Sequence, residues 1–176
     1  YADMVSYMDE QVGCLVELLK QCGIYETTLI LFSSDDGPTH NGGVNAPWFD
    51  SEGPFKSEKG WGKGSLREGG IRVPMIVHWH DQITAGSVSD HICAFWDVLP
   101  TLGEISGYSY KKTDGISFFP TLKGNRQGVH EYLYWELPEG KGSKAIRMGK
   151  WKGYLSNIKN GNRCVELYDL ETDPQE

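Results

Sequence analysis

The sequence predicts an α/β fold followed by a small antiparallel sheet, and three patterns in its 176 residues carry this prediction. A helix-periodic segment at residues 2–22 leads into a continuous apolar segment at 27–34. A second apolar segment at 71–79 precedes another helical pattern at 89–107. From residue 130 onward, short aromatic and β-branched runs alternate with turn residues. Helix and buried-strand patterns that alternate in this way favour the α/β class.

The first expected helix follows from apolar residues at three- and four-residue steps and from a stop at Gly23. Its apolar stripe, which we expect to pack against another part of the protein, consists of Tyr1, Met4, Met8, Val12, Leu15, Leu19 and Cys22. The next segment, TTLILFSS, has strand length and no polar alternation. That pattern is typical of a parallel strand covered on both faces.

Two further elements complete the predicted α/β part. The segment IRVPMIVHW at 71–79 is the second expected strand. The segment SDHICAFWDVLPTLGEISG at 89–107 is a helix that should begin at a Ser or Asp cap and end at Gly107, with Pro100 in a first turn or at a kink. Between the two strands, the glycine-rich residues 35–70 form a long loop, and such loops in compact domains are usually functional or disordered.

The C-terminal sheet is predicted from the runs EYLYWEL, KAIRMGKWKGYL and CVELYDL, with turns at residues 148–150 and 159–162. This change of pattern divides the chain into an α/β part, residues 1–107, and a small antiparallel subdomain, residues 108–176. The chain opens in helix-like sequence and closes on DLETDPQE. We therefore expect it to be a portion of a longer protein.

Charge and composition exclude several classes of partner. The chain has 17 basic and 24 acidic side chains and a formal charge of -7, a sign that repels nucleic acid and anionic membranes. No apolar run approaches the roughly 18 residues of a membrane span. The four cysteines lack metal-ligand spacing, and we expect buried free thiols. A local anion site is still compatible with the basic residues gathered in one stretch, Lys56, Lys59, Lys63, Arg67 and Arg72.

Asp35 and Asp36 are the first candidates for chemistry, because they follow the first expected strand directly. Side chains at the carboxyl ends of strands in an open α/β sheet face the crevice where ligands bind. Adjacent carboxylates repel unless a cation neutralises them, and Ca²⁺ or Mg²⁺ prefers such oxygen ligands. An aspartate-rich turn is the alternative, since D-D-G-P also suits turn chemistry.

Lys63 is the second candidate and lies in the glycine-rich segment GWGKGSLREGGIRVP. A lysine near a metal can bind anionic oxygens or donate a proton to a leaving group. The alternative is a solvated surface charge. His40, the histidine nearest to the two aspartates in sequence, could contact a substrate or protonate a leaving oxygen, or could lie in a surface loop.

A family resemblance joins these segments. The motifs TLILFSSDDGP, GKGSLREGGIRVPMIVHW, DGISFFPTLKG, YLYWE, AIRMGKWKGY and ELYDLETDP follow one another in the order found in the C-terminal half of the type I sulfatases. The chain is most similar to bacterial proteins that resemble arylsulfatase A and N-acetylgalactosamine-6-sulfatase. The resemblance implies part of an alkaline phosphatase-like mixed sheet with flanking helices. It also implies a Ca²⁺ site, with Mg²⁺ as the alternative, and a formylglycine nucleophile.

The resemblance assigns roles residue by residue. The family's S-D-N-G motif falls on residues 34–37, so that Asp35 is implied as a metal ligand and Asp36 replaces the usual asparagine. The additional charge of Asp36 could tighten cation binding, weaken the anionic substrate or change the preferred cation, and a protonated Asp36 would resemble the neutral amide. Lys63 falls on the lysine that contacts sulfate. Glu68 and Arg72 are interpreted as structural, holding the loop to the second strand.

Several parts of the family site have no counterpart here. None of the cysteines begins a C-x-P-S-R motif, no serine begins the serine version, and the N-terminal aspartate pair is missing. We therefore expect a sulfatase fragment that is inactive alone, from an enzyme that hydrolyses sulfated sugars or aryl sulfates. The alternatives are a phosphate or phosphonate ester hydrolase of the same superfamily, and a sulfatase-like protein that binds sulfated glycans without cleaving them. The family habit implies a periplasmic or extracellular location in bacteria, whereas the oligomeric state is left open.

Overall fold

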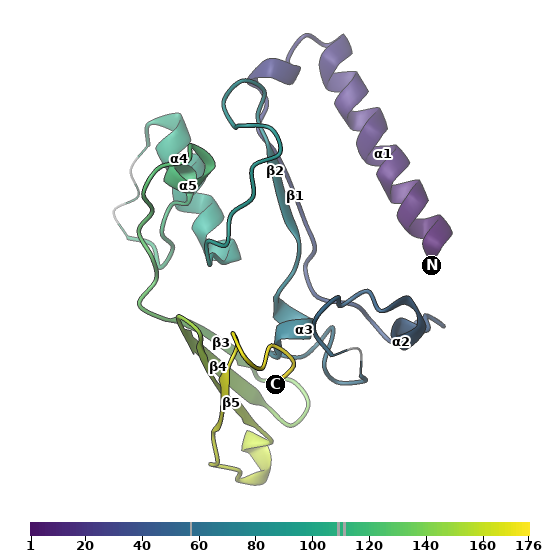
Figure 1. Ribbon diagram of the computed structural model, residues 1–176, viewed down its shortest axis with the longest axis vertical. Coiled ribbons are helices and arrows are strands. Elements are labelled where there is room, and N and C mark those ends of the chain that lie inside the picture. The colour runs from purple at the N-terminus through teal and green to yellow at the C-terminus, as the bar shows by residue number, and fades with distance from the viewer. Residues whose placement is uncertain (57, 109, 111) are drawn as a thin grey trace. The chain divides into compact units, whose positions relative to one another are not determined.

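The computed structural model describes all residues except 57, 109 and 111, and the described residues form two compact units (Figure 1). The first unit combines Tyr1–Phe32 with Met75–Gly128, and the second combines Ser33–Pro74 with Val129–Glu176. The loop after the first strand thus belongs to the same unit as the C-terminal sheet. The expected boundary between residues 107 and 108 stays a prediction.

The first unit contains the helix and strand patterns that the sequence indicates. Its elements are α1 (Ala2–Gln21), the 3-10 helix η1 (Tyr25–Thr27), β1 (Ile30–Ser33), β2 (Met75–His78), the 3-10 helix η2 (Phe95–Asp97), α4 (Val98–Ser106) and α5 (Phe119–Leu122). The strands β1 and β2 pair in a two-stranded sheet. Each is shorter than its predicted segment, because η1 precedes β1 and Pro74 lies just before β2.

The apolar stripe of α1 is exposed, which differs from the expectation that it packs. Within the described chain this helix has no buried residue, and Met4 and Leu15 are 75% and 63% exposed. Residues of β1 are half-buried instead of covered on both faces. Gly23 has a φ of 68° just beyond the helix, the left-handed conformation in which a C-terminal glycine stop is favoured.

The second predicted helix begins later than expected, so that residues 89–94 are not helical. Asp97 explains the late start, because its carboxylate accepts a hydrogen bond of 2.7 Å from the backbone N–H of Ala94, which precedes η2. Ser89 and Asp90 therefore do not begin the helix. Pro100 lies in the first turn of α4, and Gly107 ends the helix with a φ of 73°, as the sequence predicted.

Buried polar groups attach α4 to the segment that follows it. The second carboxylate oxygen of Asp97 accepts from the N–H of Ile116 at 2.8 Å. The hydroxyl of Thr101 donates to the carbonyl of Asp97 at 2.7 Å and accepts from the N–H of Phe118 at 3.0 Å. Thr101 and Phe118 are 1% and 2% exposed, so these bonds are shielded from water.

Replacing Thr101 with valine is expected to lower the free energy of unfolding by about 1–3 kcal/mol. The valine keeps the shape of threonine but leaves the buried N–H of Phe118 without its acceptor. Chemical denaturation of the full-length protein measures the change. Thr84→Val, at an exposed position of the same unit, is the matched control and should change the stability by less than about 0.5 kcal/mol.

The second unit consists of the long loop and the C-terminal sheet. Its elements are α2 (Ala46–Phe49), α3 (Glu68–Ile71), β3 (Leu133–Leu137), β4 (Ser143–Met148), β5 (Trp151–Ser156), the 3-10 helix η3 (Ile158–Asn160) and β6 (Glu166–Asp169). The four strands form an antiparallel sheet in the order β3-β4-β5-β6, which confirms the predicted antiparallel C-terminal sheet. The turn at 148–150 joins β4 to β5 as predicted, and residues 159–162 lie in the connection from β5 to β6.

The core of this unit lies where the loop meets the sheet. Ala145 and Tyr154 are opposite each other on β4 and β5, and Leu66 from the loop packs against both. All three side chains are buried. The loop at 35–70 is therefore part of the folded unit and contributes to its core.

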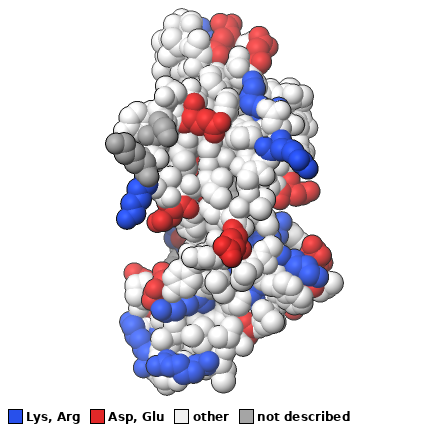
Figure 2. Space-filling model, turned by 90° about the vertical axis from the view of Figure 1, so that its left-hand side faces the viewer, with Lys and Arg blue, Asp and Glu red and all other residues white. Residues whose placement is uncertain are grey.

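Acidic and basic side chains are interspersed over the face of the molecule drawn in Figure 2. None of the described helices is long and apolar enough to cross a lipid bilayer. The four cysteines are free, as expected, but the expectation of burial is wrong for three of them, because Cys14, Cys22 and Cys164 are exposed. Each lies on a helix face or loop that nothing in the described chain covers.

Candidate functional site

The two aspartates and the lysine that the sequence singled out meet in the second unit. The Nζ of Lys63 lies 2.6 Å from an oxygen of Asp35 and 3.3 Å from an oxygen of Asp36. The side chain of Asp35 is 81% exposed, while that of Asp36 is 33% exposed. These residues are 28 and 27 positions apart in sequence, so the loop must fold back to bring the lysine to the carboxylates.

The ion pairs shift the protonation equilibria of the site in favour of the charged forms. The hydrogen bond from Lys63 holds the pKa of Asp35 below its ordinary value, and the charge of the lysine adds to this effect. Hydrogen bonds to Asp35 and then to Asp36 raise the pKa of Lys63. The ammonium and the Asp35 carboxylate are consequently both charged at neutral pH.

Backbone hydrogen bonds position the lysine. The N–H of Lys63 donates to the carbonyl of Pro38 at 2.9 Å, and the N–H of Gly37 donates to the carbonyl of Gly70 at 2.8 Å. The segment that carries the aspartates is thus bonded to both ends of the Gly62–Gly70 segment. We name residues 62–70 the lysine loop.

Glycines make this close approach of two backbones sterically feasible. A Cβ on Gly37 would lie 1.7 Å from the carbonyl oxygen of Gly69, and one on Gly62 would lie 2.2 Å from the oxygen of Pro38. A Cβ on Gly70 would meet the oxygen of Ser65 at 2.2 Å. In the sequence, this contact between the two backbones is visible only as a pattern of glycines. The need for those glycines becomes clear only when the structure brings the distant segments together.

Among the described residues, His40 makes no hydrogen bond to the aspartates or to Lys63, so its predicted role stays a prediction. Its ring is half-buried, and its Nε2 atom is buried without a hydrogen-bond partner among the described residues. His78 and His80 pack against Tyr25, with ring centroids 5.3 Å and 5.7 Å apart. These ring contacts give His78 and His80 a structural role in the first unit.

The aromatic residues of the long loop differ in how far their rings are covered by other side chains. Trp61 is covered, because the Nζ of Lys56 lies 3.7 Å and the Cζ of Arg67 lies 3.9 Å from its ring centroid. Trp61 therefore packs against two cations of its own loop. Trp48 is 73% exposed and packs edge-on against Phe49 at the end of α2.

The structural interpretation of Glu68 is confirmed, although its main partners are on the C-terminal sheet. Its side chain is buried and lies 2.9 Å from the Nζ of Lys152 on β5 and 3.4 Å from Arg147 on β4. Arg72 is a more distant partner at 3.7 Å. The motif E-G-G thus attaches the lysine loop to the sheet, a role that sequence spacing alone did not indicate.

The site provides some, but not all, of the oxygen ligands that a hard cation requires. Asp35 and Asp36 offer carboxylate oxygens, the ligand type that Ca²⁺ and Mg²⁺ prefer. Within the described part of the chain, no group of three or more His, Cys, Asp or Glu side chains could hold a metal ion. A Ca²⁺ ion takes about six to eight oxygen ligands, so these two aspartates fit as a partial ligand set that requires further donors.

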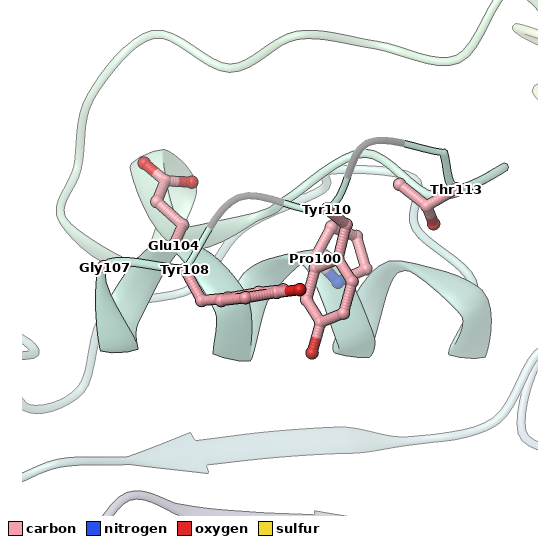
Figure 3. A pocket seen from close by; sticks show the side chains of 6 residues that line it. All are labelled: Pro100, Glu104, Gly107, Tyr108, Tyr110 and Thr113. Atoms are coloured by element: carbon pink, nitrogen blue, oxygen red, sulfur yellow. The ribbon is translucent and has the colours of Figure 1, made fainter.

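A separate hollow of about 370 Å³ lies beside α4 in the first unit (Figure 3). Its lining consists of Pro100, Glu104, Gly107, Tyr108, Tyr110 and Thr113. The rings of Tyr108 and Tyr110 meet edge to face, with centroids 4.9 Å apart. The described residues that line this hollow include the acidic Glu104 and no basic side chain, whereas the site at Asp35 and Asp36 includes Lys63, a donor for an anion.

The α/β fold with an antiparallel C-terminal sheet is of the alkaline phosphatase-like class, which the structural neighbours share. Residues 1–108 match the sulfatase family, and residues 57–176 match the C-terminal domain of N-sulphoglucosamine sulphohydrolase. The chain belongs to the sulfatase family.

Curated relatives agree with this assignment. The chain is 32% identical to mouse N-acetylgalactosamine-6-sulfatase over 88% of its length, and 28% identical to human arylsulfatase A over its whole length. It spans 29% and 38% of the lengths of these two relatives. The chain therefore corresponds to about a third of such a protein.

Solved structures show the same fold. The crystal structure of Ps i-CgsB has a TM-score of 0.79 and 32% identity, over 100% of this chain and 37% of that one. BT4656 in complex with its substrate D-glucosamine-2-N,6-O-disulfate has a TM-score of 0.76 and 25% identity, over 97% of this chain and 33% of that one. The phosphonate monoester hydrolase of Agrobacterium radiobacter, at 23% identity and a TM-score of 0.70, shares the fold.

Proposed function

We propose that the full-length protein containing this chain hydrolyses sulfate esters, with sulfated sugars or aryl sulfates as substrates. The observation that carries the proposal is the position of the Lys63 ammonium between the carboxylates of Asp35 and Asp36. The sulfated substrate of BT4656 supports the choice of a sulfated sugar. The periplasmic or extracellular location implied by the resemblance is part of the same proposal.

In this proposal Lys63 binds the transferring sulfate group. An ammonium has three N–H donors, so Lys63 can keep its bond to Asp35 while it donates to a sulfate oxygen. The fixed positive charge then stabilises negative charge that develops on the sulfate oxygens in the transition state. Asp35 holds the lysine in the charged form and orients it.

Asp35 and Asp36 would contribute two ligands to a bound Ca²⁺, with Mg²⁺ as the alternative. When bound, such a cation supplies Lewis-acid stabilisation of the sulfate group. The nucleophile implied by the family resemblance, a formylglycine, would come from a segment outside this chain. The chain's own contribution is the lysine, the two carboxylates and the backbone crossing that holds them together.

Turnover of matched esters tests the proposed reaction. The full-length protein is given the sulfate and the phosphate monoester of one aryl alcohol under the same conditions. Faster hydrolysis of the sulfate supports the proposal, and turnover of the phosphate alone would replace it with the phosphoesterase alternative. Binding of the sulfate without turnover of either ester would favour a sulfated-glycan-binding protein.

Replacing Asp36 with asparagine is expected to weaken Ca²⁺ binding by the full-length protein and to lower the KM for a sulfate ester, each by about two- to tenfold. The amide keeps an oxygen ligand but removes one negative charge, and the number of charged ligands tunes Ca²⁺ affinity. Calorimetric titration with Ca²⁺ and steady-state kinetics measure the two effects. Asp50→Asn, at an exposed position of the same loop, is the control, and unchanged values for Asp36→Asn would exclude a role for its charge.

A further inference from the structure

Three consecutive residues of the lysine loop, Leu66, Arg67 and Glu68, attach it to the C-terminal sheet. Leu66 packs in the core with Ala145 and Tyr154. Arg67 makes polar contacts with β6, and Glu68 makes polar contacts with β4 and β5. The loop that carries Lys63 is thus fixed by the sheet at three successive positions.

Arg67 binds the edge strand β6. Its guanidinium donates to the carboxylate of Glu166 at 2.9 Å and to the hydroxyl of Tyr168 at 3.1 Å. The same group lies over the ring of Tyr154 at 4.3 Å and over that of Trp61 at 3.9 Å. The planar guanidinium is therefore held by hydrogen bonds from its N–H groups and by stacking against aromatic rings.

Glu68 binds β4 and β5 through a buried cluster of charges. The side chains of Glu68 and Lys152 are 2% and 0% exposed, and their charged atoms are 2.9 Å apart. Lys152 also lies 3.0 Å from Glu176, whose other carboxylate oxygen accepts from the backbone N–H of Glu68 at 2.5 Å. Arg147 adds a second cation.

Stability alone explains this cluster poorly. Taking charges out of water costs free energy that their attraction often only offsets, and well-packed apolar residues can be as stabilising as a buried ion pair. An ion pair differs from an apolar contact in directionality, because its hydrogen bonds fix the position of the backbone that carries it. Glu68 begins the short helix α3, and Gly70 within the same helix accepts the hydrogen bond from the N–H of Gly37.

We propose that Lys152 is a positioning residue for the sulfate site: through Glu68 it holds the lysine loop so that the Nζ of Lys63 reaches Asp35 and Asp36. The chain of contacts runs from Lys152 to Glu68 at 2.9 Å, along the loop to Lys63, and from Lys63 to Asp35 at 2.6 Å. All of these residues belong to one compact unit. This inference rests on the proposed function, because it gives the C-terminal sheet a part in sulfate binding.

The test uses Lys152→Met in the full-length protein and two readouts, kcat/KM for an aryl sulfate and the inhibition constant of inorganic sulfate. We expect kcat/KM to fall and the inhibition constant to rise by about ten- to a hundredfold, because small displacements of a binding group have effects of this size. Lys150→Met is the matched control, since Lys150 pairs with Asp169 on the same sheet and, among the described residues, forms its ion pairs with Asp169 and Glu171 and not with the loop. A folded Lys152→Met protein with unchanged values would overturn the inference.

A double-mutant cycle with Lys63→Ala separates positioning from general stability. If Lys152 acts through Lys63, then Lys152→Met should have little further effect once Lys63 is absent, and fully additive losses would contradict positioning. If Lys63→Ala alone changes nothing, the proposed sulfate contact itself fails, and the positioning role fails with it.

Should Lys152→Met not fold, Glu166→Gln takes its place in the same cycle. Glu166 is 40% exposed and holds the loop through Arg67, so its replacement should leave the protein folded. We expect it to weaken inhibition by sulfate about two- to tenfold, and less in the Lys63→Ala background. Equal losses in both backgrounds would overturn positioning by the sheet.

Discussion

Replacing Lys63 with alanine in the full-length protein should lower kcat/KM for a sulfate ester by about a hundred- to a thousandfold. The ammonium is the cation that the structure places between Asp35 and Asp36, and its removal leaves two neighbouring carboxylates facing an anionic substrate. The loss should appear in kcat as well as in KM, because charge on the sulfate group grows in the transition state. Steady-state kinetics with a chromogenic aryl sulfate measures both parameters.

Lys59→Ala is the matched control for this prediction. Lys59 has the same charge, lies four residues before Lys63 and is exposed. Its replacement changes the net charge of the protein equally but should change kcat/KM less than twofold. Equal losses for the two variants would show that Lys63 acts through the overall charge of the loop and not through contact with sulfate.

Replacing Gly37 with alanine is expected to lower kcat/KM by about a hundredfold and to destabilise the full-length protein by about 1–3 kcal/mol. A Cβ at this position would lie 1.7 Å from the carbonyl oxygen of Gly69, which belongs to the backbone, so one of the two backbones must move to relieve the clash. Movement breaks the bond from the Gly37 N–H to the Gly70 carbonyl and shifts Lys63 away from Asp35. Kinetics and chemical denaturation measure the two effects.

Gly13→Ala provides the control for a simple glycine-to-alanine change. Gly13 lies inside α1, and a Cβ there meets no atom within 4 Å in this chain. Alanine favours the helix over glycine by about 1 kcal/mol, so this variant should be no less stable and equally active. Wild-type kinetics for Gly37→Ala would mean that the two backbones can separate without moving the lysine.

Much of the fold could be predicted from local sequence because local physics decides it. The stops at Gly23 and Gly107 depend on φ values that glycine adopts most readily. The antiparallel C-terminal sheet follows from alternating runs and turn residues, and its four strands pair as neighbours in sequence. The start of the second helix was placed wrongly, because the carboxylate that caps its first turn, Asp97, lies inside the apolar run and not at its polar beginning.

The candidate site shows the limit of sequence reasoning more clearly. Asp35, Asp36 and Lys63 were recognised as chemically suitable, but local spacing left a turn and a surface charge as alternatives. Their distances of 2.6 Å and 3.3 Å result from a crossing of two backbones that are distant in sequence. Glu68 was interpreted as structural, yet its buried partner Lys152 lies 84 positions away on β5.

The sequence by itself determined the family, the residue types of the site and the order of helices and strands, since these depend on motifs, periodicity and side-chain chemistry. Only the tertiary structure decided that Gly37 and Gly70 bring Lys63 to the aspartates, and that Lys152 holds the loop through Glu68. The reason is physical: hydrogen bonds and buried ion pairs between distant segments form only when the chain has closed the loops between them. Such contacts leave no periodic trace in the sequence.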